Sequence, residues 1–370
     1  MEYDLHHIEN HPDFKGLKVN EGIPQPPPVS EDSVRRFLQK RKKPLTAEEY
    51  TVGILNGDIP LLSKAVTLVE SSRPDHQEVA REIISRCLPH SGRSVRVGIT
   101  GVPGAGKSTF IEALGKLLTG KGHKLAILAI DPSSERSKGS ILGDKTRMEE
   151  LSGDPNAYIR PSPSAGSLGG VARKTRESVI LCEAAGFDTV FIETVGVGQS
   201  EIAVHSMTDF FLLLMIAGAG DELQGIKRGI MEMTDLVAIN KADGQNVEKA
   251  QLAQIQYKNA LHLFPEKESG WEPRVLTCSA LSKTGIAEVW QTVTDHHALI
   301  KSNGFFEQNR NMQSRYWMFE TINEQLRQGF YNNPALKHAL AAMEGKVLRA
   351  EISSFEAARQ LLEMYNSTNR

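Results

Sequence analysis

Residues 101–109 read Gly101-Val-Pro-Gly104-Ala105-Gly106-Lys107-Ser108-Thr109, in a chain of 370 residues. The spacing G-x-x-x-x-G-K-S is that of a phosphate-binding loop. Its context fits, because the β-rich run 95–100 precedes it and a helical pattern opens at Thr109. A strand, a glycine turn and a helix N-terminus surround a phosphate with backbone N–H groups. We expect Lys107 to reach the β- and γ-phosphates of a nucleoside triphosphate, and the Ser108 hydroxyl to hold Mg²⁺.

Composition and charge limit the possible classes of function. The formal net charge of −2 gives no bulk attraction to nucleic acid or to an acidic membrane. The N-terminus is charged where a signal peptide would be apolar, and the longest apolar run, 210–217, is too short to span a bilayer. We therefore expect a cytoplasmic protein. The cysteines lie too far apart for a disulfide framework or a zinc site, which favours a reducing compartment: Cys87, Cys182 and Cys278.

Strand and helix patterns alternate from Val95 to about Lys301, which predicts an α/β domain with a largely parallel sheet covered by helices on both faces. Ligands of such sheets gather at the carboxyl ends of the strands. The stretch 131–176 is rich in Ser, Gly and Pro, and we expect it to be irregular chain that serves the site. The expected strands are 95–100, 125–130, 188–192, 210–216, 235–239 and 274–278.

Helical patterns flank this domain. In the N-terminal part, Thr46-Ala-Glu-Glu49 is a capping box, and helices are expected over 60–71 and 75–87. In the C-terminal part three helices are expected, the last capped by Ser353 with Glu356 three positions on. Three helices in about 65 residues bury little surface alone, so they should pack on the main domain or on a second copy. The expected divisions are a mobile arm (1–29), a helical domain (30–92), the phosphate-loop domain (93–301) and a helical arm (302–370).

The tetrad Asn240-Lys241-Ala-Asp243 follows the strand 235–239 and has the spacing of a guanine-reading motif. The Asp carboxylate accepts hydrogen bonds from N1–H and the 2-amino group of guanine, and adenine lacks both donors. Adenine would therefore leave a buried carboxylate unpaired. A second turn, Ser279-Ala280-Leu281, is expected to contact the base after the strand 274–278. The order of these motifs predicts GTP rather than ATP.

The stretch Glu193-Thr-Val-Gly196 ends the strand 188–192 and takes the place of the Asp-x-x-Gly element of nucleotide sites. The Glu193 carboxylate would hold Mg²⁺, and the Gly196 N–H could sense the γ-phosphate. The next residue, Val197, cannot hydrogen-bond to an attacking water, so slow intrinsic hydrolysis is predicted. Gln199 is an alternative residue for positioning that water.

Two further acids, Asp131 and Asp144, could bind Mg²⁺ or place the attacking water. Asp131 could equally be a capping or turn residue, and Asp144 could N-cap a helix over 145–152. The histidines show no metal-ligand spacing. We expect His296 and His297 to point to opposite faces of a helix and to be exposed.

Longer strings carry a resemblance to a known family. They are Asp131-Pro-Ser-Ser with 139–148, then 158–163, 193–201 and 220–229. From about residue 45 to 370 the chain resembles the methylmalonyl-CoA-mutase-associated GTPases, of the type called MeaB or ArgK. The resemblance implies a GTPase domain related to metal-insertion GTPases, with a C-terminal arm that forms a homodimer. It also implies a GTP-dependent chaperone that gates adenosylcobalamin loading and protects or rescues an adenosylcobalamin-dependent acyl-CoA mutase.

The same resemblance implies roles for single residues. Lys107 and Ser108 would contact phosphate and Mg²⁺, with Asp131, Asp144 and Glu193 around the metal. Switch segments would lie near 131–148, 193–201 and 218–229. The third switch includes Gln224 and Lys227, and a docked mutase could move Lys227 toward the phosphates to stabilise developing charge.

Three other classes of function stay open. A nickel-insertion GTPase for hydrogenase or urease usually carries a His-rich tract or a Cys/His site near its switches, which this sequence lacks. A kinase of amino-acid transport would need an ATP pocket, whereas Asp243 indicates guanine. A nucleotide-insensitive binding protein would have no use for an intact phosphate loop.

Overall fold

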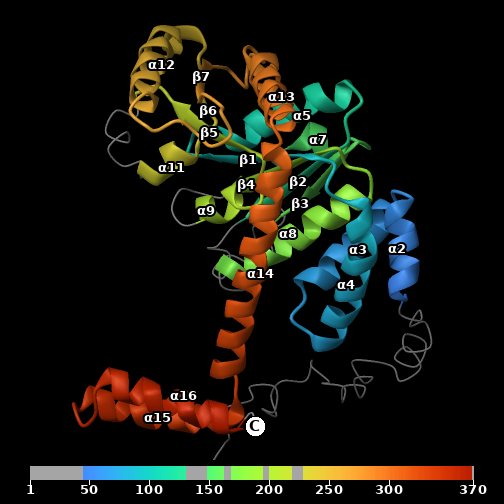
Figure 1. Ribbon diagram of the computed structural model, residues 1–370. Coiled ribbons are helices and arrows are strands. Elements are labelled where there is room, and N and C mark those ends of the chain that lie inside the picture. The colour runs from blue at the N-terminus through green and yellow to red at the C-terminus, as the bar shows by residue number, and fades with distance from the viewer. Residues whose placement is uncertain (1–44, 131–147, 162–167, 195–199, 219–227, 369–370) are drawn as a thin grey trace, which may run out of the picture. The chain divides into compact units, whose positions relative to one another are not determined.

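The computed structural model describes residues 45–130, 148–161, 168–194, 200–218 and 228–368 (Figure 1). Within them, seven parallel strands form one sheet in the order β3-β2-β4-β1-β5-β6-β7. The predicted α/β fold with a parallel sheet is confirmed. The strands are β1 (Val95–Gly101), β2 (Leu125–Ile130), β3 (Ala157–Arg160), β4 (Thr189–Thr194), β5 (Phe210–Ile216), β6 (Leu236–Asn240) and β7 (Arg274–Thr277).

Helices cover both faces of this sheet, so its central strands are buried along nearly their whole length. Figure 1 shows α5 (Lys107–Gly120) and α13 (Ile286–Ser302) on one face, with α8 (Leu168–Ala184) and α9 (Ser200–His205) on the other. Burial on both faces explains why these strands read as continuous apolar runs rather than as alternating patterns. The shorter elements around the sheet are α7 (Glu149–Ser152), α11 (Arg228–Met233), α12 (Val247–Leu261) and the 3₁₀ turns Leu88–His90 and Gly244–Asn246.

One local expectation is wrong in the stretch 131–176. Strand β3 pairs in parallel with the first four residues of β2, although the sequence predicted irregular chain there. It is a four-residue edge strand between turn-forming prolines, which is too short to show a periodic pattern. Met148 occupies the N-cap position of α7. The alternative role of Asp144 as the cap of a helix over 145–152 stays a prediction, because 144–147 lie outside the described residues.

The N-terminal helices are those that the sequence predicts, namely α2 (Ala47–Leu55), α3 (Ile59–Glu70) and α4 (Pro74–Cys87). Both hydrogen bonds of the capping box form at the start of α2. The Glu49 N–H donates to the Thr46 hydroxyl at 3.2 Å, and the Thr46 N–H donates to the Glu49 carboxylate at 2.7 Å. The end of α3 is joined to the sheet domain, because Glu70 pairs with Arg160 of β3 and its carbonyl accepts from Lys174 of α8 at 2.6 Å.

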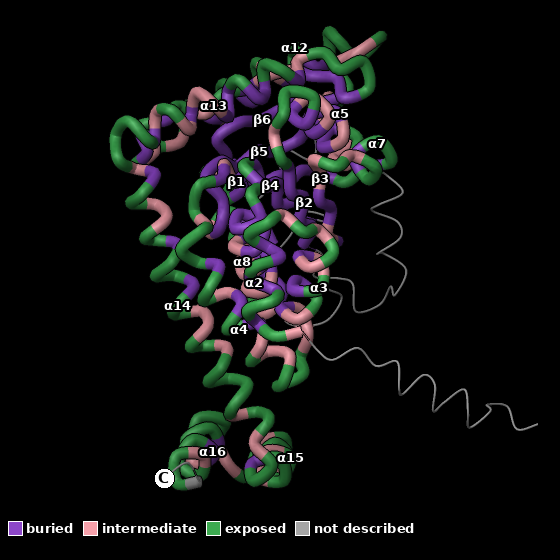
Figure 2. The backbone as a smooth tube through the Cα atoms, turned by 90° about the vertical axis from the view of Figure 1, so that its right-hand side faces the viewer, coloured by how far each residue is buried: buried purple, intermediate pink, exposed green. Residues whose placement is uncertain are grey.

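The C-terminal part consists of α14 (Phe305–Tyr331), α15 (Pro334–Leu348) and α16 (Ser354–Thr368). Two side chains of α14 hydrogen-bond to the chain that leads into β5. The Gln313 amide donates to the Thr208 carbonyl at 2.7 Å, and the Trp317 indole donates to the Ser206 carbonyl at 3.0 Å. Figure 2 shows that burial is concentrated in the strands, whereas much of α14, α15 and α16 is exposed. As predicted, the Ser353 hydroxyl caps α16 by accepting from the Glu356 N–H at 3.2 Å.

The expectation of an exposed His296 is wrong. Its side chain belongs to the core face of α13, where the residue is 2% exposed and its ring packs edge-on against Phe210 and Trp271, with centroids 5.1 Å away in each case. Buried histidines occur where aromatic neighbours fill the space around the ring, and sequence spacing alone does not reveal this.

All three cysteines are buried free thiols. None of the described helices is long and apolar enough to cross a membrane.

Candidate nucleotide site

The phosphate loop connects the carboxyl end of β1, the middle strand of the sheet, to the first residue of α5. Gly106 adopts φ 83°, a left-handed conformation that turns the chain into the helix. A Cβ at Gly101 would lie 2.2 Å from the carbonyl oxygen of Leu214 on the neighbouring strand β5, so only glycine fits there. The Lys107 ammonium folds back over the loop and donates to the Gly101 carbonyl at 2.8 Å. These features place the helix N-terminus and one ammonium group around the same small volume.

The charges of two carboxylates act on this lysine. Burial lowers the pKa of the Lys107 ammonium, and the charges of Glu193 and Glu201 act in the opposite direction. Both acids are buried, Glu193 at the end of β4 and Glu201 in the first turn of α9. Glu201 is a site residue that the sequence motifs did not predict. Its position at the start of a short buried helix directly after the 193–199 stretch is the signal that could have revealed it.

The predicted guanine-reading tetrad lies at the carboxyl end of β6 and is linked to the phosphate loop by one side chain. The Asn240 amide donates to the Ala105 carbonyl at 2.8 Å, and its oxygen accepts from the Ala280 N–H at 3.0 Å. Next to it, Lys241 has φ 60°, a left-handed conformation that is uncommon for residues other than glycine and that occurs often at ligand sites. Asn240 therefore holds the phosphate loop and the second base-contacting turn in a fixed relation.

The second turn positions the Asp243 carboxylate. The Ser279 hydroxyl donates a short hydrogen bond to that carboxylate and accepts from the Ser282 N–H at 3.1 Å. Ser279 is fully buried, whereas Leu281 is 82% exposed beside it. A carboxylate oriented in this way can accept two parallel donors from a planar base, and an exposed apolar side chain nearby can cover one face of that base.

The donor set at the end of β4 suits Mg²⁺, which prefers oxygen ligands such as carboxylates and hydroxyls. Glu193 is paired with Ile99 of β1 and with Ala129 of β2. It therefore lies at the carboxyl end of the strands, as the Ser108 hydroxyl does. The neighbouring Thr194 hydroxyl donates to the Thr100 hydroxyl at 2.8 Å within the core, which fixes the end of this strand. A buried carboxylate at the carboxyl end of β4 is thus compatible with a metal ion.

The structure brings together most of the residues that the sequence selected for this site. They come from the carboxyl ends of β1, β4 and β6, from the residues that follow β1 and β6, and from the turn after β7: Gly101, Gly104, Ala105, Gly106, Lys107, Ser108, Thr109, Glu193, Asn240, Lys241, Asp243, Ser279, Ala280 and Leu281. The other selected residues lie outside the described residues: Asp131, Asp144, Gly196, Val197, Gln199, Gln224 and Lys227.

A parallel sheet with a phosphate loop after its middle strand and a carboxylate-bearing turn after β6 defines the class of P-loop nucleotide-binding proteins. A family model described as methylmalonyl-CoA mutase-associated GTPase MeaB matches residues 62–335. The chain belongs to this family and is a GTPase, which confirms the resemblance expected from the sequence.

Individual relatives agree with this family. The chain is 49% identical over 325 residues to a probable GTPase of Mycobacterium tuberculosis, covering 88% of this chain and 97% of that protein. It is 46% identical over 328 residues to the mouse protein described as methylmalonic aciduria type A homolog, mitochondrial. This match covers 86% of this chain and 79% of the mouse protein. A solved structure titled LAO/AO transport system kinase is 38% identical with a TM-score of 0.71, and covers 88% of this chain and 99% of that one.

Proposed function

We propose that this GTPase is a chaperone of a methylmalonyl-CoA mutase-type enzyme, which gates adenosylcobalamin loading and protects or reactivates the mutase. The description of its family names that mutase, and this supports the partner. The observation that carries the nucleotide part of the proposal is the double contact of Asn240, which holds the loops for the phosphates and for the base together. A nucleotide bound across both loops would fix their separation, as a switch requires.

In this proposal the Lys107 ammonium leaves the Gly101 carbonyl and contacts the β- and γ-phosphates. The Ser108 hydroxyl and the Glu193 carboxylate would hold Mg²⁺, together with Asp131 or Asp144 from the segment outside the described residues. The bound ion would neutralise phosphate charge. Asp243 reads guanine, oriented by the Ser279 hydroxyl. Burial lowers the pKa of the Lys107 ammonium, and the negative charges of the buried Glu193 and Glu201 oppose that shift.

Hydrolysis by the isolated protein should be slow, because Val197 cannot orient water. We expect a rate of about 10⁻⁴–10⁻² s⁻¹, the range of GTPases without an activator. Lys227 is the proposed residue through which the partner accelerates turnover. Lys227→Ala should leave basal turnover and GTP affinity near the wild-type values and remove the acceleration by the mutase in single-turnover assays.

The helical arm 302–370 is the proposed dimer contact. Apolar side chains along one face of α14 are exposed, with Phe319 at 49% and Leu326 at 59%, and Phe355 at the start of α16 is 86% exposed. Exposed apolar side chains in a row are typical of surfaces that another chain covers. Sedimentation of Phe319→Glu/Leu326→Glu should give a monomer where the wild-type chain gives a dimer, and an unchanged dimer would reject this contact.

The chaperone proposal is tested with the adenosylcobalamin-dependent mutase of the same organism. The mutase is titrated with this protein bound to GDP or to a non-hydrolysable GTP analogue, and cofactor loading is followed by the absorbance of adenosylcobalamin. Loading should depend on which nucleotide is bound, and Lys107→Ala should abolish that dependence. If both nucleotides give the loading rate of the mutase alone, the chaperone proposal is rejected, although the GTPase assignment is not.

A further inference from the structure

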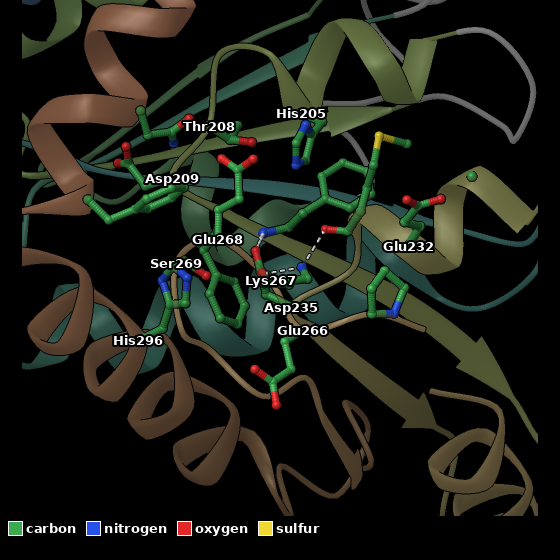
Figure 3. Close-up of a pocket in the computed structure, with 17 residues that line it drawn as sticks. His205, Thr208, Asp209, Glu232, Asp235, Glu266, Lys267, Glu268, Ser269 and His296 are labelled. Atoms are coloured by element: carbon green, nitrogen blue, oxygen red, sulfur yellow. Dashed lines mark hydrogen bonds and ion pairs between the residues drawn. The ribbon is translucent and has the colours of Figure 1, made fainter. Parts of the chain in front are cut away.

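A second cavity lies at the amino ends of β5 and β6, away from the phosphate loop at the carboxyl end of the sheet (Figure 3). Its volume is about 410 Å³, which lies within the usual range of roughly 300–1,000 Å³ for ligand sites. Phe210, Phe211, Met233 and Phe305 contribute apolar surface to its walls. The two phenylalanines of β5 are almost completely buried, so this wall is a fixed part of the core.

The polar side of the cavity is acidic. Two of its carboxylates are neutralised internally. Asp235 accepts from the Lys267 ammonium at 2.5 Å, and Asp209 pairs with the Arg310 guanidinium at 2.6 Å. Three others, Glu232, Glu266 and Glu268, form no ion pair in the described part of the chain. In Figure 3 Glu268 extends toward the side of Thr208 and Asp209, whereas Glu266 extends away from them. The cavity therefore carries a surplus of negative charge at its mouth.

One buried polar group in the wall has no partner. His296 is 2% exposed and lines the cavity, and its Nδ1 forms no hydrogen bond within the described residues. Burial lowers the pKa of this imidazole, which keeps the ring neutral, with one nitrogen able to accept a hydrogen bond. An unsatisfied buried nitrogen is costly, and a donor supplied by a ligand would remove that cost.

These three features select the chemistry of a ligand. A guanidinium or ammonium group on an aliphatic stem places its stem against an apolar wall and its charged head among carboxylates. A neutral imidazole nitrogen adds an acceptor for one of the N–H donors. An anionic ligand would be repelled by the three glutamates, and a purely apolar one would leave His296 Nδ1 without a partner.

The position of α9 favours a ligand that belongs to another protein. This short helix carries Glu201, whose charge acts on Lys107, in its first turn and His205, which lines the cavity, at its last residue. A helix of six residues thus extends from the acid that acts on Lys107 to the cavity wall. A group bound in the cavity can therefore respond to the nucleotide, as a partner's docking residue would.

We propose that this cavity receives an arginine or lysine side chain of a partner protein. The inference does not depend on which protein the partner is, so it can be tested on the isolated chain.

The test uses Nα-acetyl-L-arginine methylamide, which presents the side chain between two peptide groups. Its matched control is the citrulline derivative, in which a neutral urea replaces the guanidinium. Binding is followed by ¹⁵N spectra of the tryptophan indoles, because Trp271 packs on His296 and donates to the Asp235 carbonyl. We expect a saturable shift of the Trp271 resonance with a dissociation constant of about 1 mM, and at least tenfold weaker binding of the citrulline derivative.

Variants separate a specific site from general attraction to an acidic surface. Glu232→Gln/Glu268→Gln should weaken binding of the arginine derivative about tenfold or more, and it should fold normally because both side chains are exposed. Glu78→Gln/Glu248→Gln removes the same charge from exposed positions outside the cavity lining and should bind as the wild type does. Equal responses to the two derivatives, or unchanged binding by the cavity variant, would overturn the inference. If agmatine binds more than tenfold tighter than the arginine derivative, the ligand is a free amine and the assignment to a protein partner is wrong.

Discussion

The two ends of the same strands are built in opposite ways. At its carboxyl end β1 finishes in glycine, and Gly101 lies so close to the Leu214 carbonyl of β5 that no side chain fits. At their amino ends, charged side chains are packed into the core. There Arg96 makes two hydrogen bonds to Glu183, at 2.9 and 2.8 Å, and Arg310 of α14 pairs with Asp209.

The difference shows where the molecule satisfies its polar groups. At the amino ends the partners are internal, because the Asp209 carboxylate also accepts from the Arg96 N–H at 2.9 Å, and the Glu183 carboxylate from the Ser94 hydroxyl at 2.5 Å. At the carboxyl ends, loop N–H groups and the Lys107 ammonium are placed for an external anion. We infer that one end anchors α14 to the sheet and the other end binds the nucleotide. Changes at the two ends should therefore have separate effects.

Arg310→Ala should have the largest effect on stability. It leaves the buried Asp209 carboxylate without its main counter-charge, and removal of one partner from a buried pair costs about 3–5 kcal/mol. Urea denaturation measures the loss, and the GTP affinity of the folded protein should stay unchanged. The matched control is Arg349→Ala, whose pair with Glu351 is exposed, and which should shift the free energy of unfolding by less than about 1 kcal/mol. A similar loss in both variants would contradict the anchoring role.

Lys107→Ala should produce the converse result. GTP affinity should fall at least about 100-fold, or roughly 2.7 kcal/mol, because the variant removes the ammonium aimed at the phosphates. The free energy of unfolding should change little, because the Lys107 ammonium makes one hydrogen bond of normal length, to the Gly101 carbonyl. Its contact with the Val102 carbonyl is long, at 3.5 Å. Calorimetry of GTP binding and urea denaturation on the same sample compare the two quantities. Unchanged affinity would reject the phosphate-loop assignment.

Sequence patterns predict the phosphate loop and the tetrad at the nucleotide end, although they do not single out Glu201, and they give no indication of the ion pairs at the anchoring end; the reason is physical. The loop around Lys107 and the tetrad ending at Asp243 have fixed local spacings, so the sequence itself predicts their geometry. The pair of Arg310 and Asp209 joins residues 101 positions apart, and no local pattern indicates it. His296 was misplaced for the same reason, because Phe210 and Trp271, which bury it, come from distant parts of the chain.

A smaller effect concerns acid stability at the anchoring end. Burial acts to raise the pKa of Glu183. The charge of Arg96 and the hydrogen bonds that Glu183 accepts outweigh burial and hold this pKa below the ordinary value of 4.5. A carboxyl whose pKa is lowered in the folded state stabilises the fold above its unfolded pKa, and this contribution is lost as the pH falls through the folded value. Unfolding free energies measured between pH 7 and pH 3 should therefore decline below about pH 4.5. Glu183→Gln should be less stable at pH 7 and should decline less steeply, and an identical decline would assign the acid sensitivity to other groups.

Guanine recognition by Asp243 is the assignment on which GTP-specific function depends, and Asp243→Asn tests it by calorimetry with GTP and xanthosine triphosphate. Xanthine carries a 2-oxo group where guanine carries a 2-amino group, so an amide that donates there should reverse the preference. We expect the wild type to prefer GTP and Asp243→Asn to prefer xanthosine triphosphate, with at least about a tenfold loss of GTP affinity, or 1.4 kcal/mol. A variant that still binds GTP more tightly than xanthosine triphosphate would show that the base is read by another residue.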